Sequence, residues 1–166
     1  MKKICSTTMI IVLLLLCTNG IQAQTQQTKL NQVELLKQFH GTWKSEMVND
    51  TTWTGEMKSF GNGLEAYFRA ERKGNIVSEM KTLMGYDRKN DKLIETDLYK
   101  GSDIIVYAFW FTSKNTCMQI PYEYISNPQK APLILKYEFK SPDLFIETFN
   151  QNNKVVAVYK FNRVKK

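Results

Sequence analysis

The chain has 166 residues, of which 43% are hydrophobic and 23% are charged, a composition typical of a single globular domain. This composition excludes a disordered, collagen-like or multi-spanning membrane protein. The formal net charge is +7, but basic residues are scattered and gather only in Arg163, Lys165 and Lys166. A nucleic-acid-binding groove normally carries a dense basic stripe, so we expect no nucleic-acid partner.

The first residues have the pattern of an export signal. Lys2 and Lys3 form a basic start, residues 9–17 form an apolar run, and Ala23 is a small residue at the expected cleavage point. The run is much shorter than the ~20 apolar residues that a spanning helix needs, so we expect no membrane span. The sequence therefore predicts a signal peptide over 1–23 and a secreted or periplasmic protein.

The cysteines agree with an exported protein that has no disulfide. Cys5 and Cys17 lie in the predicted signal peptide, and only Cys117 remains after cleavage. A lone cysteine has no internal partner, so the core must supply the stability of the domain. An alternative role for Cys17 is a lipid anchor, although Leu16 stands where that pattern requires a small residue.

The folded domain is expected over 30–166, after a flexible leader. Residues 24–29 are Gln, Thr and Lys, which cannot bury apolar surface. Asn31 and Glu34 then have the spacing of a helix capping box, and Gly41 can end the helix. We predict one short helix from Gln32 to Phe39.

From Gly41 onward, apolar and polar residues alternate, and turn residues recur at short intervals. Nine turns separate ten predicted strands, with no helical segment between them. Consecutive short strands form an antiparallel meander, and a long meander removes its exposed edges by closing. The predicted fold class is all-β, an antiparallel meander closed into a barrel of about 8–10 strands with the short N-terminal helix capping one end.

The alternation also predicts which side chains face the barrel interior. The five methionines after the signal peptide all take inward positions, and so do the small residues Ser45, Gly55, Ser78 and Thr82. Methionine is flexible and suits a wall that adapts to an apolar guest, although it also fills irregular gaps in a solid core. The side chains that we expect to contact a ligand are Met47, Trp53, Met57, Phe68, Met80, Met84, Met118, Tyr122 and Tyr137.

The strand predicted over Ile104–Phe111 is apolar on both faces. Its outer face must therefore be covered, and the N-terminal helix and a second molecule are the two candidates. The long connection over 124–132, which contains Pro128 and Pro132, is a candidate lid over the open end of the barrel.

Together, the short helix, the motif Gly41-Thr42-Trp43, the meander and Arg163 in the last strand resemble the lipocalin-like (calycin) superfamily. The nearest resemblance is to uncharacterised lipocalin-like domains of exported bacterial proteins. In that superfamily, an arginine of the last strand packs across the tryptophan of the first, which implies that Arg163 and Trp43 close one end of the barrel. The sequence departs from true lipocalins in having ten predicted strands instead of eight and in lacking their disulfides.

Reactive side chains give little indication of catalysis. His40 is the only histidine and has no partner histidine for a metal site, while Cys117 has no activating base nearby in sequence. The carboxylates Glu95, Asp97 and Asp103 cluster around one hairpin, where they form a solvated rim or, facing the mouth, an acid–base pair. We expect no catalytic residue, metal or cofactor.

Three functions follow from this reading of the sequence. The leading one is an exported β-barrel that binds a small hydrophobic or amphipathic ligand in its interior. In the alternative, the barrel is solid and is a protein-interaction module that docks a protein partner or a second copy through the outer face of 104–111. The third is an enzyme that uses a rim carboxylate. A cavity above ~300 Å³ would favour the first over the second.

Overall fold

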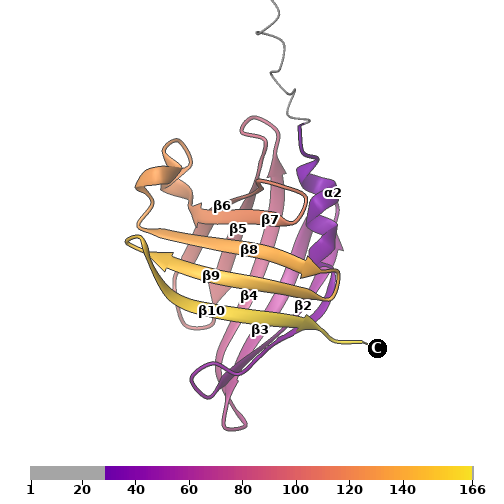
Figure 1. The fold of residues 1–166 in the computed structure, drawn as a ribbon, viewed down its shortest axis with the longest axis vertical. Helices are drawn as coiled ribbons and strands as arrows, with labels where there is room; N and C mark the ends of the chain where they lie inside the picture. Colours follow the sequence, from indigo (N-terminus) through magenta and orange to yellow (C-terminus); the bar gives the residue numbers. More distant parts are fainter. Residues whose placement is uncertain (1–28, 166) are drawn as a thin grey trace, which may run out of the picture.

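The computed structural model describes residues 29–165, in which ten strands follow a short helical segment (Figure 1). The predicted signal peptide, the Cys17 lipid anchor and the predicted leader up to residue 28 lie outside the described residues and stay predictions. The elements are α2 (Gln32–Leu36), η2 (Lys37–Phe39), β1 (Gly41–Ser45), β2 (Thr51–Phe60), β3 (Gly63–Arg72), β4 (Asn75–Asp87), β5 (Lys92–Tyr99), β6 (Ile104–Phe111), β7 (Thr116–Pro121), η3 (Tyr122–Tyr124), η4 (Pro128–Lys130), β8 (Leu133–Ser141), β9 (Leu144–Gln151) and β10 (Lys154–Arg163).

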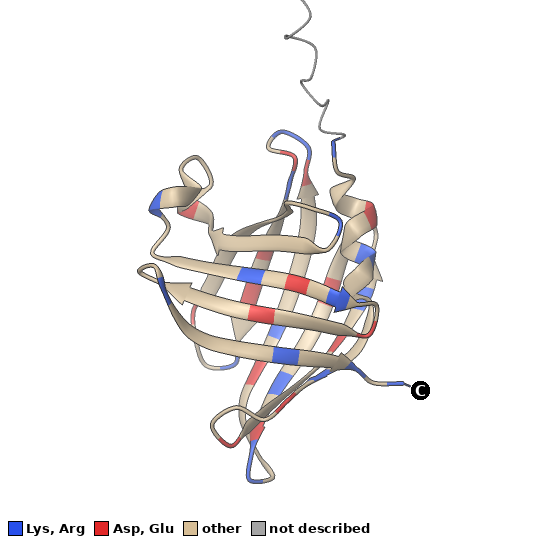
Figure 2. Ribbon diagram, viewed as in Figure 1, with Lys and Arg blue, Asp and Glu red and all other residues tan. Residues whose placement is uncertain are grey.

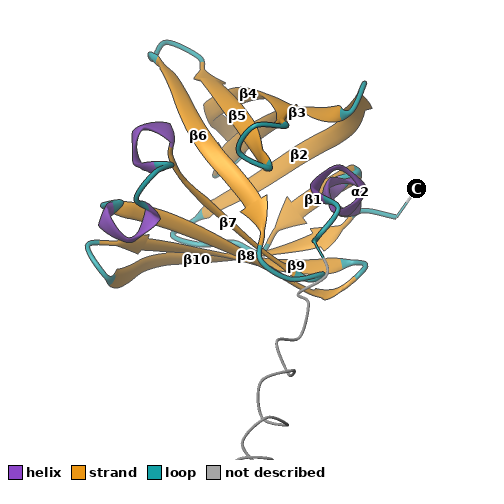
Figure 3. Ribbon diagram, turned by 90° about the horizontal axis from the view of Figure 1, so that it is seen from above, coloured by secondary structure: helices purple, strands orange, loops and turns teal. Residues whose placement is uncertain are grey.

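The strands form a closed antiparallel barrel, which confirms the predicted fold class. Each strand pairs with the next one along the chain, and β1 pairs with both β2 and β10 to close the circle. In Figure 1, β8 to β10 cross the front of the barrel while β2 to β4 run steeply behind them, and Figure 3 shows the same two walls from above. Closure pairs the edges of every strand, so the meander has no free edge for aggregation.

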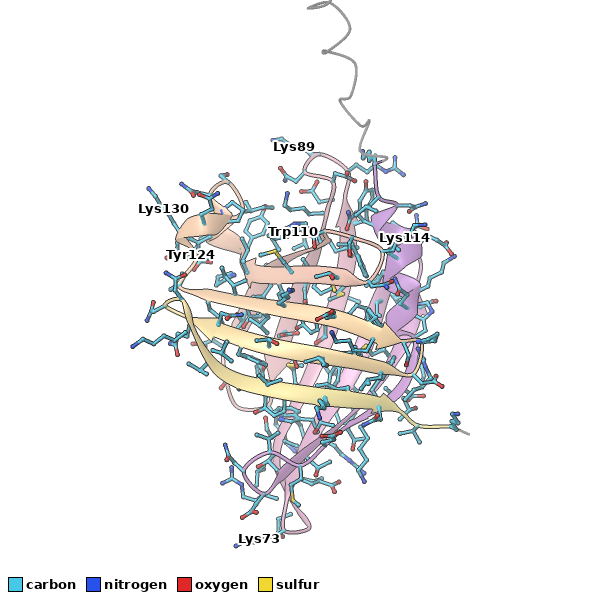
Figure 4. All side chains as sticks on the ribbon, viewed as in Figure 1. Lys73, Lys89, Trp110, Lys114, Tyr124 and Lys130 are labelled. Carbon is cyan, nitrogen blue, oxygen red and sulfur yellow. The ribbon has the colours of Figure 1, made fainter. Side chains whose placement is uncertain are left out.

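Successive turns of the meander alternate between the two ends of the barrel. The turns after β2, β4, β6 and β8 lie at the end that carries α2, and the other turns lie at the opposite end, the mouth. Figure 4 labels Lys89 and Lys114 on turns of the helix end, and Lys73, Tyr124 and Lys130 on connections at the mouth. Figure 2 shows basic and acidic residues interspersed over the visible face.

The helix at the closed end begins as its sequence predicts. The Asn31 side chain accepts a hydrogen bond from the backbone N–H of Glu34 at 3.1 Å, which satisfies one free N–H at the helix start. Gln32 is buried and ties the helix to β6, because its amide accepts from the Phe111 N–H at 2.7 Å and donates to the Phe111 carbonyl at 3.2 Å. The last turn, over Lys37–Phe39, tightens to a 3-10 helix.

Trp43 and Arg163 pack together at this closed end, as the resemblance implies. They are directly paired between β1 and β10, and the Arg163 guanidinium carbon lies 4.1 Å from the centre of the Trp43 ring. Trp43 is fully buried, and its Nε1–H donates to the Phe39 carbonyl at 2.7 Å. The guanidinium also donates to the carbonyls of Gln38 and His40, so one side chain joins the helix, β1 and β10.

Gly41 is required where the chain passes from the helix into β1. Its φ is +122°, a region that other residues rarely adopt, and a Cβ there would lie 2.6 Å from Arg163 Nη1. The glycine of the G-x-W motif therefore leaves the space in which the arginine lies.

The inward assignment of β7 was wrong by one residue. Cys117 and Gln119 face inward opposite Tyr137 and Leu135, while Met118 lies opposite the exposed Lys136 and is half-buried on the outer face. Cys117, Met118 and Ile120 make the strand apolar on both faces, so alternation could not fix its orientation, and a one-residue shift reverses every side chain.

Two further residues predicted to face inward lie at the surface near the mouth. Met47 follows the end of β1 at Ser45 and is 69% exposed. Tyr122 belongs to η3 instead of β7 and is 40% exposed. Both predictions extended a strand beyond its true end, where the period of two no longer applies.

The two-sided strand β6 is covered over part of its length. Ala108 and Ile120, paired on the outer face, are fully buried, and η3 packs beside β6. By contrast, Ile104 and Ile105 near the mouth are 60% and 39% exposed. The cover therefore comes from the chain's own connection between β7 and β8, while the helix reaches only the far end of the strand.

Candidate functional site

The barrel encloses a cavity of about 340 Å³, within the range typical of small-molecule sites. Its wall is mainly apolar and aromatic, with three carboxyl groups and a few neutral polar groups. It is lined by Phe39, Trp53, Met57, Leu64, Ala66, Phe68, Ser78, Met80, Thr82, Met84, Glu95, Asp97, Tyr99, Tyr107, Phe109, Gln119, Leu135, Tyr137, Phe145, Glu147, Phe149, Ala157, Tyr159 and Phe161.

The structure brings most of the predicted ligand-contacting residues to this cavity. The six that line it are Trp53, Met57, Phe68, Met80, Met84 and Tyr137. Met47, Met118 and Tyr122 do not, for the reasons given above. Ligand contact by any of the nine residues stays a prediction. The methionines of β2 and β4 line the same cavity, as expected.

Only some of the small inward residues leave space in the cavity. Ser78 and Thr82 line it, as predicted. At Gly55 the space is filled by the Phe68 ring, which a Cβ would meet at 2.1 Å. The Ser45 hydroxyl accepts a hydrogen bond from the Trp53 N–H at 2.8 Å, so it serves the packing of β1 against β2.

A cluster of three carboxyl groups lies inside the barrel, and we define it as the acidic cluster, Glu95, Asp97 and Glu147. Glu95 and Asp97 come from β5 and are only 6% and 4% exposed, while the half-buried Glu147 comes from β9. Thr82 donates a hydrogen bond to Asp97 Oδ1. Glu95 Oε2 is buried and has no hydrogen-bond partner among the described residues.

Burial holds these carboxyl groups partly protonated near neutral pH. Desolvation raises the pKa of Asp97 to about 6, against the opposing hydrogen bonds with Thr82 and Glu95. Desolvation also raises the pKa of Glu147 to about 7, while the neighbouring Tyr137 hydroxyl donates its hydrogen bond to Gln119 Oε1. The pKa of Glu95 lies well above its usual value because the group is buried and the charges of Asp97 and Glu147 are close to it.

The location of Glu95 and Asp97 differs from the predicted solvated rim, whereas Asp103 is exposed on the connection after β5. The outer face of β5 carries the apolar residues Ile94 and Leu98. A prediction that places these apolar residues inside the barrel would therefore put both carboxyls outside. The alternation of residues within β5 therefore could not predict that the two carboxyls face the interior. Leu93 and Tyr99 lie on the same side of the strand as the two carboxyls, and Leu93 is buried with them.

The other reactive groups lie away from the cavity or are inert. His40 ends the helical segment, and burial and the charges of Lys37 and Arg163 lower its pKa. Burial raises the pKa of the Cys117 thiol well above its usual value, which disfavours the reactive thiolate. Within residues 29–165, no group of three or more His, Cys, Asp or Glu side chains is arranged to hold a metal ion.

No described helix is both long and apolar enough to cross a membrane. Comparison of the sequence with protein-family models gives no match, and no curated protein matches it either. The cavity and the acidic cluster are therefore the features from which a function must be argued.

Proposed function

We propose that this chain binds a small hydrophobic or amphipathic molecule in the barrel cavity. The observation that carries the proposal is an interior of about 340 Å³ whose wall joins apolar side chains to a few convergent polar groups. This combination is typical of ligand sites, in which the apolar wall gives affinity and the polar groups orient the guest. A barrel that only had to be stable would fill this space with apolar side chains.

We also propose that the chain is a member of the lipocalin-like superfamily and is exported. The paired Trp43 and Arg163 and the helix before β1 support a place in the lipocalin-like superfamily. The basic and apolar start of the chain supports export to the periplasm or the exterior. Mass measurement of the protein purified from its natural source tests the export, because cleavage after Ala23 leaves a chain that begins at Gln24.

Binding of the neutral dye N-phenyl-1-naphthylamine, which fluoresces in apolar surroundings, tests the proposed function. We expect the wild-type protein to enhance its fluorescence and Met80→Trp to abolish this, because the larger side chain fills the cavity. Val158→Trp is the control, since the same large side chain on an exposed position of β10 leaves binding intact. Circular dichroism checks that both variants keep the fold.

Two results would contradict the proposal. The first is a wild-type protein that binds no dye, combined with a Met80→Trp variant that unfolds from overpacking. The second is dye binding that Met80→Trp leaves unchanged, because the dye would then occupy the outer surface.

A second candidate function is docking through the outer face of β4 to β6. Leu83, Leu98 and Ile104 are 49%, 48% and 60% exposed and line one groove on this face. Exposed apolar residues that gather in this way are typical of protein-interaction surfaces. Sedimentation of the wild type and of Leu98→Lys tests this function, which requires self-association or partner binding that the lysine removes.

A further inference from the structure

We propose that the guest is an organic cation, an amphipathic amine whose ammonium group lies among Glu95, Asp97 and Glu147 while its apolar part lies against the methionine wall. This inference rests on the proposed function and specifies the chemistry of the ligand. It follows from the cavity lining, from an unsatisfied buried oxygen and from the charge balance inside the barrel.

The acidic cluster has no compensating positive charge in the cavity wall. Three carboxyl groups line one space, and the described lining contains no lysine, arginine or histidine. Burying a carboxylate costs several kcal/mol unless it is paired, which is why buried charges normally have an ionic partner. Since the chain supplies none here, the compensation comes from bound protons or from a cationic guest.

The buried oxygen Glu95 Oε2 indicates which kind of group the guest supplies. It is a covered oxygen of a residue that lines the cavity, and no N–H or hydroxyl group of the described residues donates to it, although Glu95 and Asp97 lie within hydrogen-bond reach of each other. Buried oxygens are almost always satisfied in native proteins, so Glu95 shares a proton with Asp97 in the empty barrel and exchanges it for a donor of the guest when the guest binds. An ammonium group has three N–H donors and can bond to more than one acceptor at once.

The other guest chemistries fit less well. The carboxylate of a fatty acid would be repelled by the acidic cluster. A metal ion needs ligands that converge closely, and the described residues contain no such group. A neutral alcohol has a single O–H donor and leaves the charge of the cluster uncompensated.

The cavity also provides for the apolar part of such a guest. Met57 from β2 and Met80 and Met84 from β4 line it on flexible side chains that adapt to different shapes. Aromatic rings at Trp53 and Tyr137 offer faces that attract a cation in a dry site.

The titratable groups around the cluster make binding depend on pH. Those facing it are Glu95, Asp97 and Tyr99 of β5, Tyr107 of β6, Cys117 of β7, Tyr137 of β8 and Glu147 of β9. Burial raises the pKa of each tyrosine and of the thiol, so these groups stay neutral near pH 7. An ammonium ion binds the ionised carboxyls, so its affinity should rise with pH between about 5 and 8, with release of protons.

Displacement of N-phenyl-1-naphthylamine by n-octylamine, n-octanol and n-octanoate tests the inference, because the three compounds share one chain and differ in charge. At pH 7.5 we expect the amine to displace the dye at a concentration about tenfold lower than the alcohol, with octanoate weakest. Calorimetry in buffers of different ionisation enthalpy should show proton release with the amine only.

Three near-isosteric variants, Glu95→Gln, Asp97→Asn and Glu147→Gln, assign the preference to the cluster. Each should weaken octylamine about tenfold and leave octanol unchanged. Glu65→Gln, on an exposed position of β3, is the control and should preserve the preference. The variants remove buried charge without changing volume, and if one fails to fold the other two still give the result.

The outcomes separate the two proposals. Equal displacement by amine and alcohol, or an amine preference that survives all three variants, overturns the inference and leaves the proposed function intact. Stabilisation by Ca²⁺ or Mg²⁺ that the three variants abolish also overturns it, in favour of a metal site. A protein that binds neither the dye nor any of the three compounds contradicts the proposed function itself.

Discussion

At the scale of single residues, Glu95, Asp97 and Glu147 decide how the stability of the empty barrel depends on pH. Their pKa values are raised in the folded state, so the folded protein binds more protons near neutral pH than the unfolded chain does. The stability that protonation supplies is complete below the unfolded pKa values and is lost as the pH rises through the folded ones.

We therefore predict that the ligand-free protein becomes less stable between about pH 4 and pH 7, the range from the ordinary pKa values of Asp97 and Glu147 to their raised ones. For Asp97, a pKa raised from 3.8 to about 6 corresponds to roughly 3 kcal/mol of unfolding free energy as an upper bound. Urea unfolding at several pH values measures the slope. Glu147→Gln should flatten it, whereas Glu65→Gln should not. Stability that increases from pH 5.5 to 7 would contradict the burial of these groups.

At the scale of elements, the helical segment, β1 and β10 form one packed unit at the closed end. Trp43 donates to Phe39, Arg163 donates to Gln38, and Gln32 is bonded to Phe111 on β6. Phe39 and Phe145 pack edge-on at 5.4 Å between ring centres, which extends this unit into the core. The closed end is thus held by contacts between residues far apart in the sequence.

Trp43→Ala should destabilise the domain by about 3–5 kcal/mol, because it leaves a cavity in the packed unit and removes the ring under Arg163. Trp110→Ala is the control, since that ring is half-buried and pairs with Met118 across the outer face. Chemical denaturation measures the unfolding free energy of both variants. A loss below about 1 kcal/mol for Trp43→Ala would mean that the closed end contributes little to the core.

At the scale of the whole molecule, closure of the barrel provides the stability that small secreted domains often gain from disulfides. Cys117 is the free cysteine of the described residues, and it is fully buried. The core cluster extends from Leu36 of the helix through the barrel to Phe161 of β10. A chain of this size can bury enough apolar surface to fold without covalent links.

If export removes residues 1–23 as proposed, the protein from its natural source should have the same melting temperature with and without reductant, because Cys117 then has no internal partner. Thermal unfolding of the monomer followed by circular dichroism measures this, with Cys117→Ser melted alongside to separate loss of packing from loss of a bond. A reductant-dependent melting temperature of the monomer would show that a second cysteine is retained and that the signal peptide boundary is wrong.

The sequence alone determined the architecture, because local signals were sufficient for it. Asn31 and Glu34 marked the helix start, the turn residues separated ten strands, and alternation within β2 to β4 placed Met57 and Met80 inside. Each of these signals depends on neighbours within a few residues. They needed no knowledge of which strands would pair.

Only the tertiary structure decided the orientation of β5, β7 and β9 and therefore the chemistry of the cavity. On these strands apolar side chains occupy both faces, so alternation could not tell which face closes on the interior. Closure of the barrel fixes that choice through the register with neighbouring strands, and it turns Glu95, Asp97 and Glu147 inward and Met118 outward. The acidic cluster could not be predicted because burying carboxyl groups opposes the hydrophobic pattern from which inward faces are inferred.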